Sequence, residues 1–241
     1  MTYLLRTLLI TLLLQASDRS IGQQLPLQFA AGGGISRVTH RGIMGSYSPA
    51  PSLNAGAWYV APFPGTVSFK TGITYGMKAY RSRLELRDSI TIYVDQGTTR
   101  LHYLSVPLLI TVQLWQRQAH AVSFSGGMSY GFLLKARSKI DQEVYVDGRL
   151  SRRQDHTIDH KISLLPPLDI LPAGQGHASL YRFQPSVNGE LLYTFRKRYI
   201  IRAFYEYNLY DATINQVTGG AMNLHMAGLS VGIGIGGKKR T

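Results

Sequence analysis

The first stretch that could carry chemistry is RRQDHTIDH, residues 152–160. It contains an acidic residue followed by a histidine twice, four positions apart, as Asp155-His156 and Asp159-His160. On a helical turn this spacing places both pairs on one face, where carboxylate and imidazole groups could bind a divalent metal ion. A solvated polar loop accounts for the same residues without any metal or cofactor, and we favour that interpretation.

A second group consists of basic residues near the expected ends of β-strands. Arginine suits phosphate because its planar guanidinium donates two hydrogen bonds at once. We therefore predict a site for anionic phosphate groups, against the simpler alternative of ordinary solvated loop charge. The residues are Arg81, Arg83, Arg87, Arg100, Arg137 and Lys139.

Histidine and serine with an acidic partner could form a hydrolytic site. His102 and Ser105, together with an acidic loop residue, are the candidates. Such an enzyme needs a nucleophile, a base and a group that orients the base, and no sequence motif supports that set here. We expect no catalytic residues, and a lipid-modifying hydrolase is the alternative function.

The elements that position these residues are β-strands, as residues 182–209 illustrate. Between residues 182 and 196 the odd positions are mostly apolar and the even positions mostly polar, and the alternation resumes at Ile201 after a basic turn at 196–198. Side chains on a strand alternate between its two faces. The segment is therefore predicted to be a hairpin with one apolar and one polar face.

The same alternation predicts eight strands. The links after the second, fourth and sixth strands have only a few residues each. The links after the first, third, fifth and seventh strands are longer, with about a dozen, about fifteen, more than forty and about nine residues. Short turns at one end and long loops at the other are typical of outer-membrane barrels with periplasmic termini. We predict an all-β fold, an eight-stranded antiparallel up-and-down transmembrane β-barrel with long extracellular loops. A soluble lipocalin-like barrel is the alternative. The expected strands cover residues 27–40, 53–63, 66–84, 100–115, 120–136, 182–195, 199–209 and 222–236.

An eight-stranded barrel is just wide enough to be filled by its own side chains, so a wide pore is not expected. Charged residues of inward parity must pair or reach water. We predict an interior salt-bridge network, with a proton or ion path as the alternative. The charged residues of inward parity are Lys70, Lys78, Lys135, Glu190, Arg202 and Glu206.

Two local expectations concern single positions. Alternation along residues 100–115 places Trp115 inside the barrel. In the last strand, Leu224 and Met226 have the parity opposite to that of Leu229 and Val231, and a β-bulge near Ala227 would bring all of them to the outer face.

The N-terminus is typical of an export signal. Arg6 supplies a positive charge, residues 8–14 form a short apolar core, and Ser20-Ile21-Gly22 places small residues at the usual cleavage positions. We predict a cleaved signal at residues 1–22 and a barrel domain at 23–241. Cleavage after Ala16 is a second possibility, and an uncleaved anchor is the alternative. Export without a later apolar helix favours the cell outer membrane.

Composition narrows the class of partner. The chain carries 26 basic and 13 acidic residues, a formal charge of +13, and it has no cysteine. The basic residues are scattered through strand ends and turns instead of forming an aromatic-interleaved stripe, so nucleic acid is not expected. In an outer membrane, the phosphates of lipopolysaccharide are anions that the basic residues could contact. We expect the barrel to be monomeric.

Several segments resemble the PorT-like outer-membrane β-barrel family of the Bacteroidetes. They are FAAGGGIS, TGITYGMKAYRS, LHYLSVPLLITVQL and VSFSGGMSYGFLL, of which the segment from Tyr103 to Leu109 is the most specific. The resemblance implies an eight-stranded barrel with a cleaved signal. Some members serve the type IX secretion and gliding apparatus, which implies an envelope protein complex as a possible partner. The family offers no catalytic motif.

The segment at residues 137–181 is larger than is usual in that family. EVYVDGRLSR alternates around Asp147-Gly148, a two-residue hairpin signal, and predicts an extracellular ribbon that continues the fifth strand. The apolar, proline-rich residues 162–174 are consistent either with a lid over the barrel mouth or with a docking segment for a partner.

Overall fold

The computed structural model describes residues 26–41, 45–63, 65–160, 162–163, 179–196, 198–209, 213–214 and 221–235. The predicted export signal and most of the proline-rich segment lie outside these residues. Among the described residues, no helix is long and apolar enough to cross a membrane.

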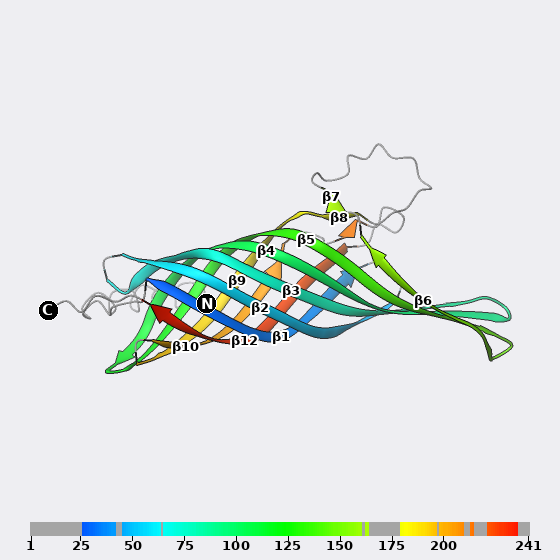
Figure 1. Cartoon of the computed structure of the whole chain (residues 1–241), viewed down its shortest axis with the longest axis horizontal. Helices are drawn as coiled ribbons and strands as arrows, with labels where there is room; N and C mark the ends of the chain where they lie inside the picture. The colour runs from blue at the N-terminus through cyan, green and yellow to red at the C-terminus, as the bar shows by residue number, and fades with distance from the viewer. Residues whose placement is uncertain are drawn as a thin grey trace, which may run out of the picture.

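Eight antiparallel strands close into a barrel (Figure 1). Neighbouring strands in the ring follow the order β4-β3-β2-β1-β12-β10-β9-β5, and the pairing of β4 with β5 completes it. The fold class is as predicted. The strands are β1 (Leu27–Arg41), β2 (Ser46–Pro62), β3 (Val67–Arg87), β4 (Thr91–Arg117), β5 (His120–Val146), β9 (Phe183–Phe195), β10 (Tyr199–Asn208) and β12 (Ala221–Ile235).

Four further strands lie outside the ring. β6 (Arg149–Asp159) pairs with β5 alone among the described strands. The short strands β7 (Ile162–Ser163), β8 (Ser179–Tyr181) and β11 (Thr213–Ile214) form a separate small sheet.

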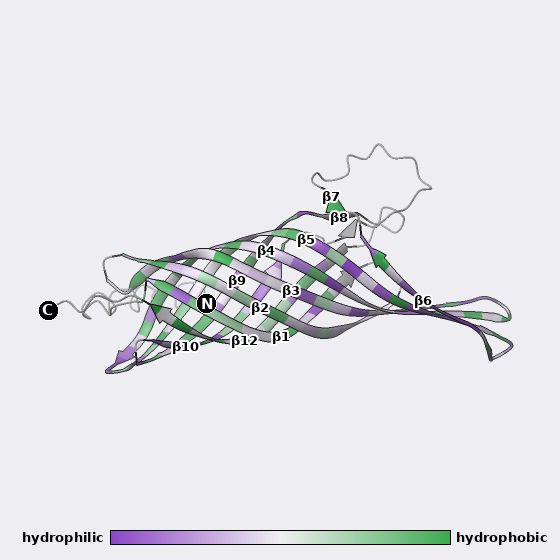
Figure 2. Cartoon of the chain, in the orientation of Figure 1, coloured by the Kyte–Doolittle hydropathy of each residue, from purple (hydrophilic) through white to green (hydrophobic). Residues whose placement is uncertain are grey.

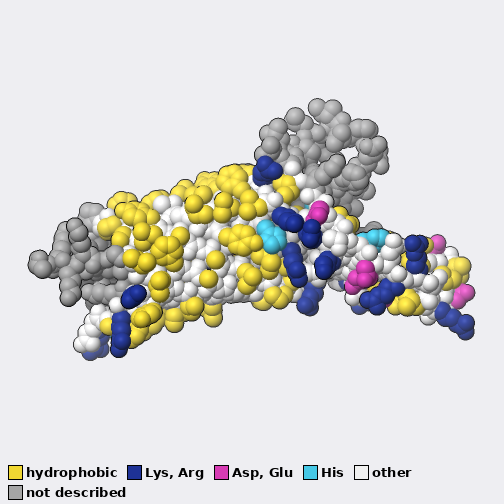
Figure 3. Space-filling model, in the orientation of Figure 1, with side chains coloured by type: hydrophobic (Ala, Val, Ile, Leu, Met, Phe, Trp, Pro, Cys, Tyr) yellow, Lys and Arg dark blue, Asp and Glu magenta, His cyan; other side chains and the backbone are white. Residues whose placement is uncertain are grey.

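Alternation along each strand separates an apolar outer surface from a polar interior. In the β9–β10 hairpin Leu191 and Ile201 are about half exposed, at 49% and 50%, whereas Glu190 and Arg202 are 6% and 3% exposed. On the face shown in Figure 3, apolar side chains form a broad belt over the barrel wall, and Figure 2 shows apolar residues recurring along the barrel strands. A soluble barrel would bury its apolar face instead, so the wall has the polarity of a membrane barrel.

The seam between β1 and β12 closes the ring without any register shift, from Leu27 opposite Ile235 to Arg41 opposite Ala221. Glycine is needed where these strands approach most closely. A Cβ on Gly32 would collide with the backbone carbonyl of Leu229. Because the pairing runs without a shift through Ala227, which lies opposite Ile35, the predicted bulge near Ala227 is wrong.

Loop lengths differ from the prediction at three of the four long links. β2 begins at Ser46 and not near residue 53, so the first link is residues 42–45 instead of about a dozen residues. β3 and β4 continue outward until only residues 88–90 separate them, and β5 and β6 meet at Asp147-Gly148. The reason is continued cross-strand pairing, from Arg87 opposite Ile92 and from Val146 opposite Arg149. The four strands together make a long projecting sheet, the extracellular ribbon (residues 81–100 and 137–159), which continues the long axis of the barrel (Figure 1).

The Asp147-Gly148 hairpin is confirmed, and its backbone explains the residue types. Asp147 has φ of 50° and Gly148 has φ of 73°. Positive φ at both central residues is the requirement of a type I′ turn, whose twist matches that of paired strands.

Two register shifts between β4 and β5 move side chains that simple alternation misplaces. One lies at His102/Tyr103 and leaves Leu134 as an extra residue on β5; the other lies at Gln113/Trp115. Each shift reverses parity beyond it. Lys135 is consequently exposed, not interior, and Trp115 is 42% exposed, not interior.

Candidate functional site

The barrel interior holds a buried cluster of charges contributed by three strands. Lys70 Nζ on β3 lies 2.5 Å from Glu190 Oε2 on β9, and Arg202 Nη1 on β10 lies 3.6 Å from Glu190 Oε1. Arg202 also donates a 2.7 Å hydrogen bond to Asn54 Oδ1 on β2. All three charged side chains are at most 6% exposed. The cluster thus ties four strands together across the barrel.

Trp58 lies against both cations of this cluster. The Lys70 ammonium is 4.8 Å from the Trp58 ring centroid, and the Arg202 guanidinium is 4.6 Å from it. Arg202 lies equally close, 4.6 Å, to the Phe204 ring. Cation–π contacts of this kind strengthen when they are desolvated, so the buried indole stabilises the two positive charges that share one carboxylate.

A second ion pair lies farther toward the extracellular end. Lys78 Nζ donates to Glu206 Oε1 at 2.8 Å and to Asn208 Oδ1 at 2.7 Å. Ser186 Oγ donates to the same Glu206 oxygen at 2.9 Å. Five of the six charged residues predicted inside thus lie there, in two ion-paired groups, whereas Lys135 does not.

An apolar cluster fills the interior beyond the second ion pair. Leu101, Leu133 and Leu224 are each 1% exposed, and Tyr103 is 2% exposed. Sequence alternation missed this cluster because Leu224 was assigned to the outer face. The sequence did contain a signal for this cluster, because the apolar residues Leu101, Tyr103 and Leu133 occupy positions of inward parity. The cluster consists of Val38, Tyr80, Leu101, Tyr103, Leu133, Ala136 and Leu224.

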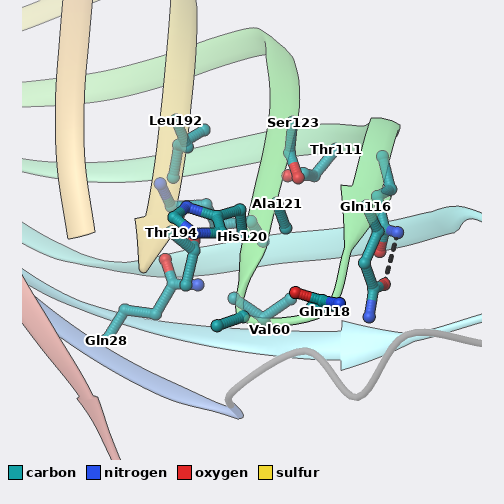
Figure 4. Close-up of a pocket in the computed structure, with 13 residues that line it drawn as sticks. Gln28, Val60, Thr111, Gln116, Gln118, His120, Ala121, Ser123, Leu192 and Thr194 are labelled. Atoms are coloured by element: carbon teal, nitrogen blue, oxygen red, sulfur yellow. Dashed lines mark hydrogen bonds between the residues drawn. The ribbon is translucent and has the colours of Figure 1, made fainter. Parts of the chain in front are cut away.

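At the opposite end, near the short turns, the interior contains a small polar chamber of about 50 Å³. Figure 4 shows Gln28, Thr111, Ser123 and Thr194 among the side chains that line it. Lys70 also borders this chamber, so the cluster of Lys70, Glu190 and Arg202 lies next to the mouth at the short-turn end, whereas the apolar cluster separates it from the ribbon end.

The predicted phosphate ligands gather on the outside, where the barrel narrows into the ribbon. Five of the six line one open hollow of about 500 Å³, together with Ser46, Ser48 and Asp141. Their strands explain the grouping: Arg81 lies opposite Ser48 on β2 and Thr98 on β4, and Arg100 lies opposite Arg137. We call Arg81, Arg83, Arg100, Arg137 and Lys139 the basic band.

Three members of the basic band have no acidic partner within the described part of the chain, namely Arg81, Arg100 and Lys139. Arg137 donates to both carboxylate oxygens of Asp159, with Nε to Oδ1 at 2.7 Å. The hydrogen bond from Arg137 lowers the pKa of Asp159 and raises that of Arg137. Arg87, the sixth predicted ligand, lies at the ribbon tip and pairs with Glu85 at 2.6 Å.

The candidate metal ligands do not assemble a metal site. Residues 152–159 lie on the β6 strand and not on a helical turn, so the pairs are spread along the ribbon. Asp159 is engaged by Arg137, and His160 Nε2 lies 2.6 Å from Ser138 Oγ. Burial lowers the pKa of His160. Among the described residues, no group of three or more His, Asp or Glu side chains is placed to hold a metal ion.

The hydrolase candidates are also separated. His102 lies on the outer face, where its Nδ1 is 2.6 Å from the Tyr75 hydroxyl. Ser105 faces the interior and is 8% exposed. The barrel wall stands between the two side chains, so they cannot act together as nucleophile and base.

An antiparallel eight-stranded barrel with an apolar belt and a charged interior defines a membrane-spanning β-barrel. Residues 15–213 match the outer membrane protein beta-barrel domain family. This is most of the chain, so the protein belongs to that family and resides in the cell outer membrane.

Several solved structures are similar in fold. Ail of Yersinia pestis, in complex with the heparin analogue sucrose octasulfate, has 13% identity and a TM-score of 0.40, with 87% of this chain and 98% of that chain covered. Neisserial surface protein A has 9% identity and a TM-score of 0.39, with coverages of 87% and 97%. The N-terminal barrel domain of Pseudomonas aeruginosa OprF has 12% identity and a TM-score of 0.33, with coverages of 88% and 100%. No curated protein matches the chain.

Proposed function

We propose that this outer-membrane barrel has a structural and interaction role, and that its basic band binds the phosphates of lipopolysaccharide. The observation that carries the proposal is the convergence of Arg81, Arg83, Arg100, Arg137 and Lys139 around one hollow. Guanidinium groups match phosphate oxygens in shape as well as in charge.

The position of the basic band fits phosphate groups at a membrane surface. It lies next to the apolar belt on the ribbon side, beyond the level where His102 pairs with Lys135. Figure 3 shows dark blue side chains gathered beside that belt, where the barrel meets the ribbon. Arg81, Arg100 and Lys139 are exposed and lack acidic partners among the described residues, so their charges are available to an external anion.

The test measures binding of purified lipopolysaccharide to the full-length protein in detergent. Replacing Arg81 and Arg100 together with glutamine should weaken binding, and the wild-type protein should lose a comparable fraction of its affinity when the lipopolysaccharide is dephosphorylated. Arg87→Gln is the matched control, because Arg87 lies outside the hollow and pairs with Glu85. Equal affinities of the double variant and the wild type would refute the proposal.

We also infer membership of the PorT-like lineage and an envelope protein partner, on the basis of the sequence segments that resemble that family. A mild-detergent pull-down from the native membrane tests this inference. Co-purification of other envelope proteins at fixed stoichiometry is expected, and recovery of the barrel alone would count against it.

A further inference from the structure

The ribbon ends in a strand with a free edge. β6 is paired with β5 on one side, and no described strand pairs with its other side. Ten of its eleven residues are exposed. Its backbone N–H and C=O groups along that edge can therefore accept a further strand, as exposed edges do in general.

The β6 sequence is complementary to itself in the antiparallel direction. In RLSRRQDHTID the central residue is Gln154, and a second copy placed antiparallel about it sets Arg153 opposite Asp155 twice. The same register sets Arg152 opposite His156, and the regular part of the pairing ends there, because Ser151 is an extra residue in the pairing of β6 with β5. Opposite charges directly across two strands are a favourable combination.

Asp155 has a further reason to attract a cation. On the paired side it lies directly opposite Asp141 of β5, and no described basic group forms a salt bridge with either carboxylate. Like charges in this position destabilise a strand pair. An arginine arriving from a second copy would neutralise this repulsion. The centre of the register, from Arg152 to His156, is regular, because the one shift between β5 and β6 leaves Ser151 as the extra residue just before it.

We propose that β6 pairs with β6 of a second copy of this chain, antiparallel about Gln154. The ribbon continues the long axis of the barrel (Figure 1). Antiparallel pairing reverses the ribbon direction, so the two barrels lie at opposite ends of the joined sheet. The contact consequently links two facing outer membranes.

Pairing within one membrane is disfavoured by the same residues. Two copies in one membrane point the same way, so their β6 strands would meet in parallel, with equal residues near one another. Arg152 and Arg153 would then approach their own counterparts, and like charges would repel. Charge thus selects the facing arrangement.

Clustering of vesicles that carry the full-length protein, followed by turbidity at low salt, tests the proposal. Wild-type vesicles should cluster. Arg153→Asp alone and Asp155→Arg alone should each cluster about tenfold more slowly or worse, because each creates like-charge pairs in the self-register. A mixture of Arg153→Asp vesicles with Asp155→Arg vesicles should cluster again, because their charges are complementary in the same register.

Controls separate this contact from other causes. Arg87→Asp makes the same change of charge at the other hairpin tip and should leave clustering unchanged. The chain has no cysteine, so Gln154→Cys should give disulfide dimers between two differently labelled vesicle populations. The proposal is overturned if wild-type vesicles do not cluster, if the single variants cluster as the wild type does, if the mixture stays as slow as its components, or if Gln154→Cys dimers form only within one vesicle.

Discussion

Lys70 and Glu190 form a buried ion pair across the barrel, with 2.5 Å between Nζ and Oε2. Glu190 also lies 3.6 Å from Arg202, so one carboxylate balances two cations. Burying charge costs several kcal/mol unless the charges are paired, and this carboxylate supplies the pairing for both.

Glu190→Gln should destabilise the barrel by about 3–5 kcal/mol, because it leaves two buried cations without a counter-ion. Unfolding in urea, followed by the gel shift between folded and heat-denatured barrel, measures the change. Glu85→Gln is the control: its ion pair with Arg87 is on the ribbon surface, and the loss should be within about 1 kcal/mol. Equal effects of the two substitutions would show that the interior pair is not structural.

Leu101→Ala should cost about 2–5 kcal/mol, because Leu101 is 1% exposed in the apolar cluster and its removal leaves a cavity. Leu101→Met keeps most of the volume and should cost less than about 1.5 kcal/mol. The same urea titration measures both. Indistinguishable stabilities of the alanine variant and the wild type would contradict a packed outer interior.

The Arg137–Asp159 pair on the ribbon predicts a pH dependence. The hydrogen bond from Arg137 lowers the pKa of Asp159, so the pair stabilises the ribbon above the usual carboxyl range and is lost as pH falls through the lowered pKa. The carboxyl-carbon chemical shift of Asp159 should therefore titrate below that of an ordinary aspartate. In Arg137→Gln the midpoint should move up toward the ordinary value; an unchanged midpoint would remove Arg137 as the cause.

The export signal remains a prediction. The N-terminal residue of protein isolated from outer membranes should be Gln23, because Ser20 and Gly22 occupy the positions that signal peptidase recognises. N-terminal sequencing or intact mass decides the point. A chain that retains Arg6 would show an uncleaved anchor.

Much of the fold could be predicted because side-chain parity is a local property. Leu191 and Ile201 alternate with Glu190 and Arg202 in the sequence itself, and turn chemistry at Asp147-Gly148 fixes a hairpin. Neither inference requires knowledge of distant segments.

The errors arose where pairing with a distant strand changes parity. Lys135 follows the strand pattern in sequence, but the register shift opposite His102 turns it outward. Leu224 looked like a lipid-facing residue because it is apolar, whereas its unbroken pairing with Val38 turns it inward. The basic band was predicted as a set of residue types, but the hollow depends on the register of β2 through β5.

The central claim is that the apolar rows face lipid and the charged rows fill the barrel, and the chain's two tryptophans test it directly. Trp58 is 2% exposed inside the ion cluster, whereas Trp115 is 42% exposed on the outer surface. Trp115→Phe and Trp58→Phe each leave one tryptophan, whose fluorescence is measured in bilayers with brominated acyl chains. We predict strong quenching of Trp115 and little of Trp58; quenched Trp58 with shielded Trp115 would contradict the account.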